Sequence, residues 1–300
     1  MTTDEAGRIW NRRVPKRFID THVHLWNRTG ALSYQWLDVD DDTSLGSLSE
    51  VRFDLWDAQR FLDDVRHHRP ERVVHVQAAD GAGDSAPESA WLQTQADKHG
   101  VPNAFVAGIG LRSDDLEAAL DAQSDFPQFR GVRDMSTMGA IGSDLSCGLG
   151  ALERRGLSWE AALTWEEMDA LRALAHEHPN LPIALGHAGF PLERTEEYFA
   201  NWSRALRSLG SATNVVCKVS GLGMSDHRWT TQSWRPLIDT CLEAFGPDRC
   251  MFGSNWPLDR IYASYDAVVG AVADIVSDLS PNESDDFWYG TATRFYQLNG

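Results

Sequence analysis

Short runs of apolar, often β-branched residues alternate along this chain with longer segments of helical character. Seven such runs can be identified, at residues 18–25, 72–78, 103–110, 129–135, 181–189, 214–221 and 249–255. Strands interleaved with helices are typical of βα units that build a parallel sheet. A chain of 300 residues that is 42% hydrophobic has the size of one closed α/β barrel. We therefore predict a single-domain (β/α)8 TIM-like barrel over 1–300, with 1–16 as an N-terminal extension; the eighth strand is not evident in the sequence.

The net charge limits the kinds of partner that we expect this protein to bind, and the cysteine pattern indicates its cellular compartment. The formal net charge is −17, whereas nucleic acids and anionic membranes bind clustered Lys and Arg, so neither is an expected partner. We identify no signal peptide and no apolar run of about 20 residues. The four cysteines form no CxxC pair, which favours a reduced cytoplasmic protein. The expected partner is a small molecule, and the sequence leaves homo-oligomerisation open.

The first apolar run contains two histidines that are one residue apart. In the segment FIDTHVHLWN, strand alternation would place Phe18, Asp20, His22 and His24 on one side. Two imidazoles about 7 Å apart along a strand can converge on one metal ion. The alternative is that both rings are hydrogen-bonded inside a crowded interior. His75, in the second run, is interpreted as such a core histidine.

Further polar residues stand where the predicted strands end. A barrel enzyme builds its site at the carboxyl ends of its strands. The candidates at these ends are Gln77, Asp80 and Glu88 after the second run, Arg133 and Asp134 after the fourth, His187 after the fifth, Lys218 and Ser220 in the sixth, and Ser254 and Asn255 in the last. Histidines at separate ends of one barrel indicate a functional site.

Five motifs in order give the chain a family resemblance. THVHLW, GHAGFP, CKVSGL, MFGSNWPLD and GTATRFY, spread over residues 18–298, resemble the amidohydrolase-related lactonase group of the amidohydrolase superfamily. The resemblance implies a (β/α)8 barrel that opens lactones of sugar acids or of aromatic-degradation intermediates such as dicarboxylates. More distant relatives cleave amides or decarboxylate aromatic acids, so the fold follows more safely than the substrate.

The resemblance also assigns roles by position. His22 and His24 match the metal-binding HxH, and His187 matches the histidine of the fifth strand. A single Zn²⁺ or Mn²⁺ on His22, His24 and either His187 or Glu88 is expected, with a metal-independent enzyme as the alternative. Asn255 stands where many members have the Asp of GSDWP, which takes a proton from the attacking water. Because an amide does not titrate in the useful range, Asn255 puts this scheme in doubt.

Glu88 is the first candidate for a replacement base. It follows a strand by a glycine-rich loop and resembles the Glu that precedes Trp-Leu in relatives. The alternative is a glutamate that interacts with the dipole at a helix N-terminus. His187, Asn255 and Glu88 are thus the predicted catalytic residues.

Four residues are predicted to bind the substrate. Arg133 could clamp a substrate carboxylate through its planar guanidinium, or it could pair with a neighbouring Asp. Lys218 could bind a carboxylate or polarise a carbonyl, whereas a buried lysine without function would need an acidic partner. Trp36 and Trp256 are expected to form apolar walls.

The function predicted from these residues is hydrolysis of a small cyclic ester. Amide hydrolysis and non-oxidative decarboxylation are the enzymatic alternatives. A barrel that binds a small molecule without turnover is the alternative from another class, because Asn255 removes the clearest proton acceptor.

Overall fold

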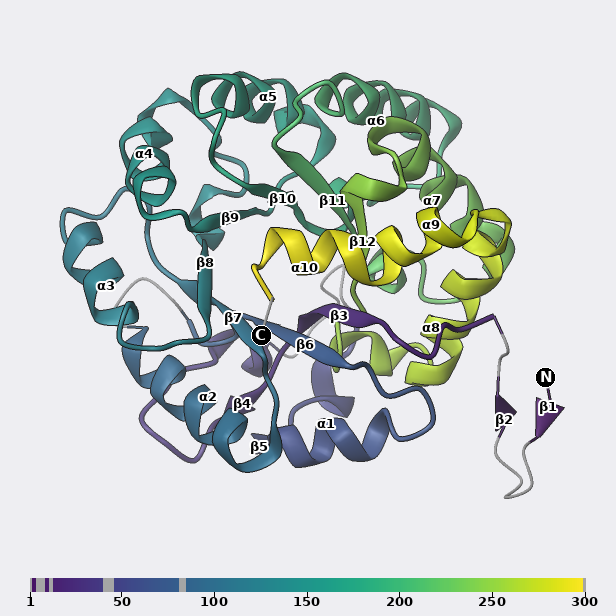
Figure 1. Cartoon of the computed structure of the whole chain (residues 1–300), viewed down its shortest axis with the longest axis horizontal. Helices are drawn as coiled ribbons and strands as arrows, with labels where there is room; N and C mark the ends of the chain where they lie inside the picture. Colours follow the sequence, from purple (N-terminus) through teal and green to yellow (C-terminus); the bar gives the residue numbers. More distant parts are fainter. Residues whose placement is uncertain (1, 4–8, 11–12, 40–45, 81–84, 299–300) are drawn as a thin grey trace.

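The computed structural model describes residues 2–3, 9–10, 13–39, 46–80 and 85–298, and its centre is a barrel of eight parallel strands (Figure 1). The strands are β3 (Ile19–Val23), β6 (Arg72–Val76), β7 (Ala104–Gly108), β8 (Phe129–Arg133), β9 (Ser158–Ala161), β10 (Ile183–Leu185), β11 (Val215–Val219) and β12 (Cys250–Phe252). Each strand pairs with the next in sequence order. A parallel bridge between Val23 and Trp256 joins the two ends, and the His24 amide donates to the Trp256 carbonyl at 2.8 Å. The predicted single-domain TIM-like barrel is confirmed.

Helices surround the strands, as Figure 1 shows. They are α1 (Ala58–Asp64), α2 (Ala86–His99), α3 (Leu116–Gln123), α4 (Ser146–Arg155), α5 (Met168–Glu177), α6 (Glu196–Leu209), α7 (Thr231–Phe245) and α8 (Tyr265–Ile275). The chain ends with α9 (Pro281–Asp285), which starts at a Ser280–Glu283 capping box, and α10 (Thr291–Phe295), which lies across the barrel in Figure 1. No helix of the described residues is long and apolar enough to cross a membrane.

Two small antiparallel pairs lie outside the barrel. β4 (Trp26–Asn27) pairs with β5 (Leu55–Trp56) beyond the first barrel strand. β1 (Thr2–Thr3) pairs with β2 (Ile9–Trp10) in the predicted N-terminal extension. Residues 1, 4–8 and 11–12 of that extension lie outside the described residues, so its boundary at residue 16 stays an expectation.

The strand that the sequence did not reveal is β9, with the sequence SWEA. It is short, and a glutamate occupies its interior position. Glu160 is nonetheless buried, because the Lys218 ammonium lies 2.8 Å from Oε2 and the Tyr296 hydroxyl donates to Oε1. With β9 in place, His187 follows the sixth strand, Lys218 lies in the seventh and Asn255 follows the eighth, which corrects the predicted count by one.

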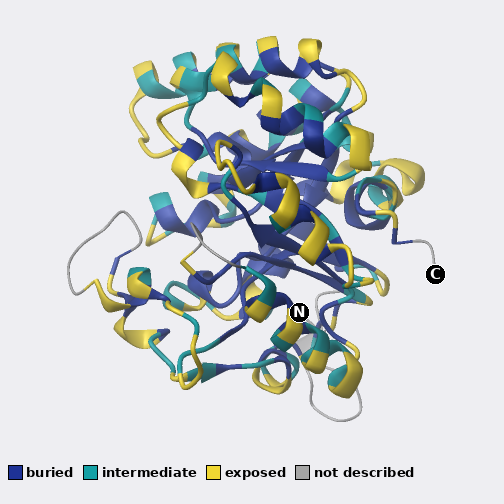
Figure 2. Cartoon of the chain, turned by 90° about the vertical axis from the view of Figure 1, so that its left-hand side faces the viewer, coloured by how far each residue is buried: buried dark blue, intermediate teal, exposed yellow. Residues whose placement is uncertain are grey.

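The core has an inner and an outer layer, and both are buried while the outer helix faces are exposed (Figure 2). The inner layer is small: it combines strand residues such as Ile19, Val76 and Val106 with Tyr289 and Tyr296 of the C-terminal helices. The outer layer packs the helices against the strands. The C-terminal helices therefore close one end of the barrel interior, and the strand carboxyl ends at the other remain for the site.

A bulge in β3 decides where its histidines point. The register with β6 shifts between Asp20 and Val23. Asp20 consequently accepts a hydrogen bond from Tyr265 of α8 at 3.0 Å, while His22 and His24 lie together 4.9 Å apart by ring centroids. The prediction that Asp20 shares a side with both histidines is therefore corrected, because a bulge interrupts simple alternation.

Candidate active site

A cavity of about 680 Å³ opens at the carboxyl ends of the strands. Its apolar walls come from loops and 3-10 turns that follow the strands: Trp36, Ala78, Met135, Phe190, Met224 and Leu258. Its polar lining comprises His24, Ser33, Gln35, Gln77, Asp80, Arg133, His187 and Asn255. An apolar cavity with a few convergent polar groups is the usual form of a small-molecule site.

Three histidines gather at this end of the barrel. The His22 ring centroid lies 4.3 Å from that of His187 and 4.9 Å from that of His24. His24 Nδ1 donates to the Val76 carbonyl at 2.8 Å, which leaves Nε2 as the ring's acceptor nitrogen. His187 sits at φ 51° just after β10, and its Nδ1 pairs with the Ser220 hydroxyl at 3.0 Å. The tautomer of His24 is therefore set by its backbone partner.

Burial and neighbouring positive charge keep these rings neutral. Burial, together with the positive charges of Arg133 and Lys218, lowers the pKa of His187 to about 3. Burial likewise holds the pKa values of His22 and His24 well below the ordinary range. At neutral pH each ring therefore has one nitrogen lone pair, which is the form that binds metal or accepts a proton.

The histidines have the right chemistry for a metal, but their arrangement is incomplete. Both ring nitrogens of the buried His22 lack a hydrogen-bond partner, which is costly unless something else binds there. However, within the described ranges no group of three His, Cys, Asp or Glu side chains has a metal-binding arrangement. His22 and His24 are therefore donors of the right chemistry for a metal ion, and the three-ligand set that includes His187 stays a prediction.

Arg133 brings a positive charge to the cavity. From the end of β8 its Nε donates to Gln77 Oε1 at 3.0 Å and its Nη2 donates to the Gln77 carbonyl at 2.5 Å. Within the described part of the chain it forms no ion pair with a carboxylate, and the neighbouring Asp134 instead accepts from the Leu111 amide. Burial lowers the pKa of Arg133 to about 10, so it stays charged at neutral pH.

Asn255 lines the cavity, and its side chain is hydrogen-bonded to the buried carboxyl group of Asp259. The residue has φ 59°, and its Nδ2 donates to Asp259 Oδ1 at 3.0 Å. Asn255 Oδ1 and Asp259 Oδ2 are buried without a hydrogen-bond partner. Burial raises the pKa of Asp259 to about 7. An amide and a titratable carboxyl group therefore act as a pair at this position.

Four predicted site residues are not part of the lining of this cavity: His22, Glu88, Lys218 and Trp256. Glu88 is buried, and its Oε1 accepts from the amides of Ala78 and Ala79 at 3.0 and 2.8 Å, so it holds the loop after β6 in place. Lys218 has the acidic partner Glu160 and also donates to the Thr21 carbonyl at 2.8 Å. Trp256 is buried outside the cavity, where its indole donates to Asp64 at 3.0 Å. Arg133, Trp36, His187, His24 and Asn255, by contrast, lie together.

Asp259 and Glu160 were not identified as site residues from the sequence. Asp259 lies in the motif MFGSNWPLD, four residues after Asn255, in the turn η9 (Leu258–Ile261). Its amide donates to the Asn255 carbonyl at 3.3 Å, which brings the two residues together. Glu160 had no comparable signal, because its strand is short and polar.

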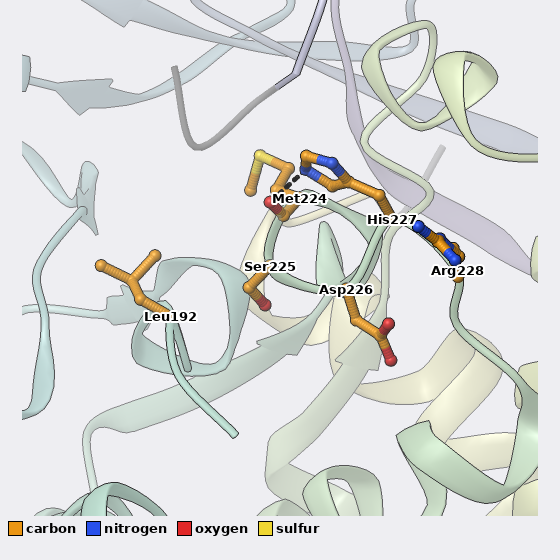
Figure 3. Close-up of a pocket in the computed structure, with 6 residues that line it drawn as sticks. All are labelled: Leu192, Met224, Ser225, Asp226, His227 and Arg228. Atoms are coloured by element: carbon orange, nitrogen blue, oxygen red, sulfur yellow. Dashed lines mark hydrogen bonds between the residues drawn. The ribbon is translucent and has the colours of Figure 1, made fainter. Parts of the chain in front are cut away.

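A shallower depression of about 530 Å³ lies beside the cavity, and Figure 3 shows its lining. It is formed by Leu192 and residues 224–228, and Met224 borders both spaces. The His227 ring turns back over this loop, where Nε2 donates to the Met224 carbonyl at 3.1 Å. The depression contains none of the three clustered histidines.

Comparison with known proteins agrees with this geometry. Residues 19–298 match the Amidohydro_2 family, described as amidohydrolase. An uncharacterized protein of Sinorhizobium fredii, y4mH, is 32% identical over 93% of this chain and 98% of its own length. An L-fucono-1,5-lactonase of Burkholderia multivorans is 30% identical over 93% of this chain and 96% of its own. The crystal structure of a B. multivorans amidohydrolase with bound Zn has a TM-score of 0.80 at 29% identity, over 94% of this chain and 99% of that one.

The chain belongs to the amidohydrolase family, and its barrel is that of a hydrolytic enzyme. Within the superfamily it belongs with the lactonase group, as the sequence motifs predict. The predicted fold, family and enzyme class are thus confirmed.

Proposed function

We propose that this enzyme hydrolyses a lactone that bears a carboxylate. The observation that carries the proposal is the composition of the cavity: neutral histidines and Asn255 adjoin Arg133 between apolar walls, and Arg133 has no carboxylate partner among the described residues. Asp80 is the one carboxylate among the described lining residues. The lactonase names of two relatives support the reaction type. The apolar walls and Arg133 favour an acid with an apolar body over a polyhydroxylated sugar lactone.

Three residues would carry out substrate binding, water orientation and proton transfer. Arg133 binds the substrate carboxylate and orients the ring. Asn255 Oδ1 accepts a hydrogen bond from the attacking water, whose oxygen bonds to the lactone carbonyl carbon. The neutral His187 takes the water's proton and returns it to the ring oxygen as the carbon–oxygen ester bond breaks. One acid with a free hydroxyl group leaves the cavity.

His22 and His24 are the residues that would hold a metal ion. When bound, a Zn²⁺ or Mn²⁺ ion would lower the pKa of its water and polarise the carbonyl. The buried, unpartnered nitrogens of His22 support this assignment, and so does the Zn in the B. multivorans structure. Two protein ligands bind less tightly than three, so we expect a metal that exchanges readily.

A substrate panel tests the proposal. Purified protein with no added metal, with Zn²⁺ or with Mn²⁺ would be assayed by proton release on L-fucono-1,5-lactone, a carboxylate-bearing lactone and an anilide. We expect turnover of the carboxylate-bearing lactone, and its loss in His187→Ala. His176→Ala, which alters an exposed histidine of α5, is the control and should leave the rate unchanged. Absence of lactone turnover under all three conditions, or cleavage of the anilide alone, would overturn the proposal.

A further inference from the structure

The carboxyl group of Asp259 has no role in the proposed hydrolysis, although it is buried in contact with Asn255, which lines the cavity. Asp259 is 1% exposed and Asn255 is also 1% exposed, and their side chains are joined by the hydrogen bond of 3.0 Å from Nδ2 to Oδ1. That bond uses the donor end of the Asn255 amide. The acceptor end, Oδ1, is left without a protein partner in a residue that lines the cavity.

Asp259 lacks the cation that usually accompanies a buried carboxylate. Within the described residues it forms no ion pair, and the adjacent Arg260 pairs with Asp64 instead. Its Oδ2 has no well-aligned hydrogen-bond partner among the described residues, although the nearby Gly223 backbone favours the charged form. Burial in this position disfavours the charged form and raises the pKa of the Asp259 carboxyl group to about 7.

The groups packed around Asp259 leave Asn255 as its main polar partner. From the turn η7 (Leu222–Ser225), the Gly223 backbone approaches so closely that a Cβ there would lie 3.3 Å from Oδ2 and 2.9 Å from Tyr262 Cδ2. Tyr262 comes directly after the turn η9, which contains Asp259. The His227 ring stacks on the Tyr262 ring, with the ring centroids 4.6 Å apart. Figure 3 shows His227 at this loop. The charged neighbour is Asp20 on β3, which accepts from the Ser254 amide at 2.8 Å and from Tyr265.

We propose that Asp259 is a positioning residue that sets which end of the Asn255 amide faces the cavity. The ionised carboxylate can only accept, so it holds Nδ2 and turns the Oδ1 acceptor toward the reacting water. The protonated carboxyl group can donate to Oδ1, which favours the flipped amide and turns an N–H donor toward the cavity. One proton on Asp259 thus exchanges an acceptor for a donor beside the substrate, and no covalent bond changes.

This inference rests on the proposed lactone hydrolysis for its effect on rate, but not for its geometry. Because an acceptor is needed to orient water, kcat should rise with pH through the range in which Asp259 ionises. That range centres near pH 7, because burial raises the Asp259 pKa to about 7. KM should change little, because substrate binding is assigned to Arg133.

The kinetic test compares four proteins on the carboxylate-bearing lactone from pH 5.5 to 8.5. In Asp259→Asn we expect the step in kcat to disappear, kcat at pH 8 to fall about tenfold, and KM to stay within about twofold. The swapped variant Asn255→Asp/Asp259→Asn restores one carboxyl group to the pair and should regain a titrating step. Asp266→Asn, which removes a partly buried carboxyl group of α8 that pairs with His68, is the matched control. A step that persists unchanged in Asp259→Asn overturns the proposal.

A second measurement is independent of turnover, and its wild-type part does not depend on the folding of any variant. The side-chain amide resonances of Asn255 would be followed by NMR across the same pH range in the wild-type protein. We expect them to shift with a midpoint near pH 7 and, in Asp259→Asn, to stay constant. If they do not titrate in the wild-type protein, the positioning role is wrong; if they titrate but no lactone is hydrolysed, only the proposed function fails.

Discussion

Arg133 decides which charge the cavity accepts. Its guanidinium is held by two hydrogen bonds to Gln77 and has no carboxylate partner among the described residues. The protein as a whole carries a net charge of −17 and repels anions at a distance. Arg133 is the one Lys or Arg among the described residues that line the cavity, so a substrate carboxylate there depends on it.

Replacing Arg133 by Met should weaken use of an acidic lactone while preserving the apolar volume of the side chain. We expect kcat/KM for a carboxylate-bearing lactone to fall by an amount equivalent to about 2 to 4 kcal/mol. The methyl ester of the same lactone serves as the control and should be much less affected. Equal losses on both substrates would mean that Arg133 acts through Gln77 and the cavity shape.

Asp259 should also reveal itself in the pH dependence of stability. The pKa of Asp259 in the folded protein, about 7, lies above its ordinary value of 3.8. The folded state therefore binds this proton more tightly than the unfolded state does. The stability that this provides is complete below about pH 4 and is lost as pH rises to 7. The free energy of unfolding of the wild-type protein, relative to Asp259→Asn, should therefore fall by up to about 4 kcal/mol over that range. Urea unfolding of both proteins at several pH values measures the difference. Parallel curves would contradict an elevated pKa.

At the scale of elements, a buried ion pair links three parts of the barrel. Lys218 of β11 contacts Glu160 of β9 and donates to the Thr21 carbonyl of β3, while Tyr296, after α10, donates to Glu160. Both charged groups are buried, with exposures of 0 and 2%. The pair therefore orders strands that are not neighbours in the sheet.

A double-mutant cycle tests whether Lys218 is structural. Lys218→Met should destabilise the protein by about 3 to 5 kcal/mol, because it leaves Glu160 charged and unpaired. Adding Glu160→Gln should recover much of this loss, because a neutral amide can still accept from Tyr296. Chemical unfolding of the three variants gives the coupling energy. If the double variant is stable and has lost activity on the acidic lactone but not on its methyl ester, Lys218 has a role in substrate binding.

At the scale of the whole molecule, the barrel brings together side chains that are far apart in sequence. His22 and His187 are separated by 165 positions, and their ring centroids lie 4.3 Å apart. His22 and His24, the residues proposed to hold a metal ion, lie 4.9 Å apart by ring centroids in the folded chain. Binding to the folded state alone raises the midpoint of thermal unfolding.

Zn²⁺ should therefore stabilise the fold through His22 and His24. At a free concentration 100 times Kd, the stabilisation would be about 2.7 kcal/mol, which is a rise of a few degrees in Tm. Differential scanning fluorimetry with and without Zn²⁺ measures it. The shift should be absent in His22→Ala and retained in His176→Ala. An equal shift in both variants would place the metal elsewhere on the protein.

Much of the fold and part of the site are determined by local sequence. The alternation of apolar runs with helical segments predicted seven of the strands and the barrel, because the periods of strands and helices are written in neighbouring residues. Of the predicted site residues, His24, His187, Arg133, Trp36 and Asn255 line one cavity, because parallel strands bring their carboxyl ends to one side. Their roles stay predictions. The family motifs identified the enzyme class, because each motif is a short local stretch of sequence.

Only the tertiary structure decided how these residues are used. β9 was missed because its buried Glu160 is polar, and its burial depends on Lys218 and Tyr296, which lie 58 and 136 positions away. The bulge in β3, which separates Asp20 from His22, depends on pairing with β6. The pKa of Asp259 and the neutrality of the histidines arise from burial by distant segments. Local periodicity specifies elements, whereas desolvation and partner choice are properties of packing, which no short stretch of sequence contains.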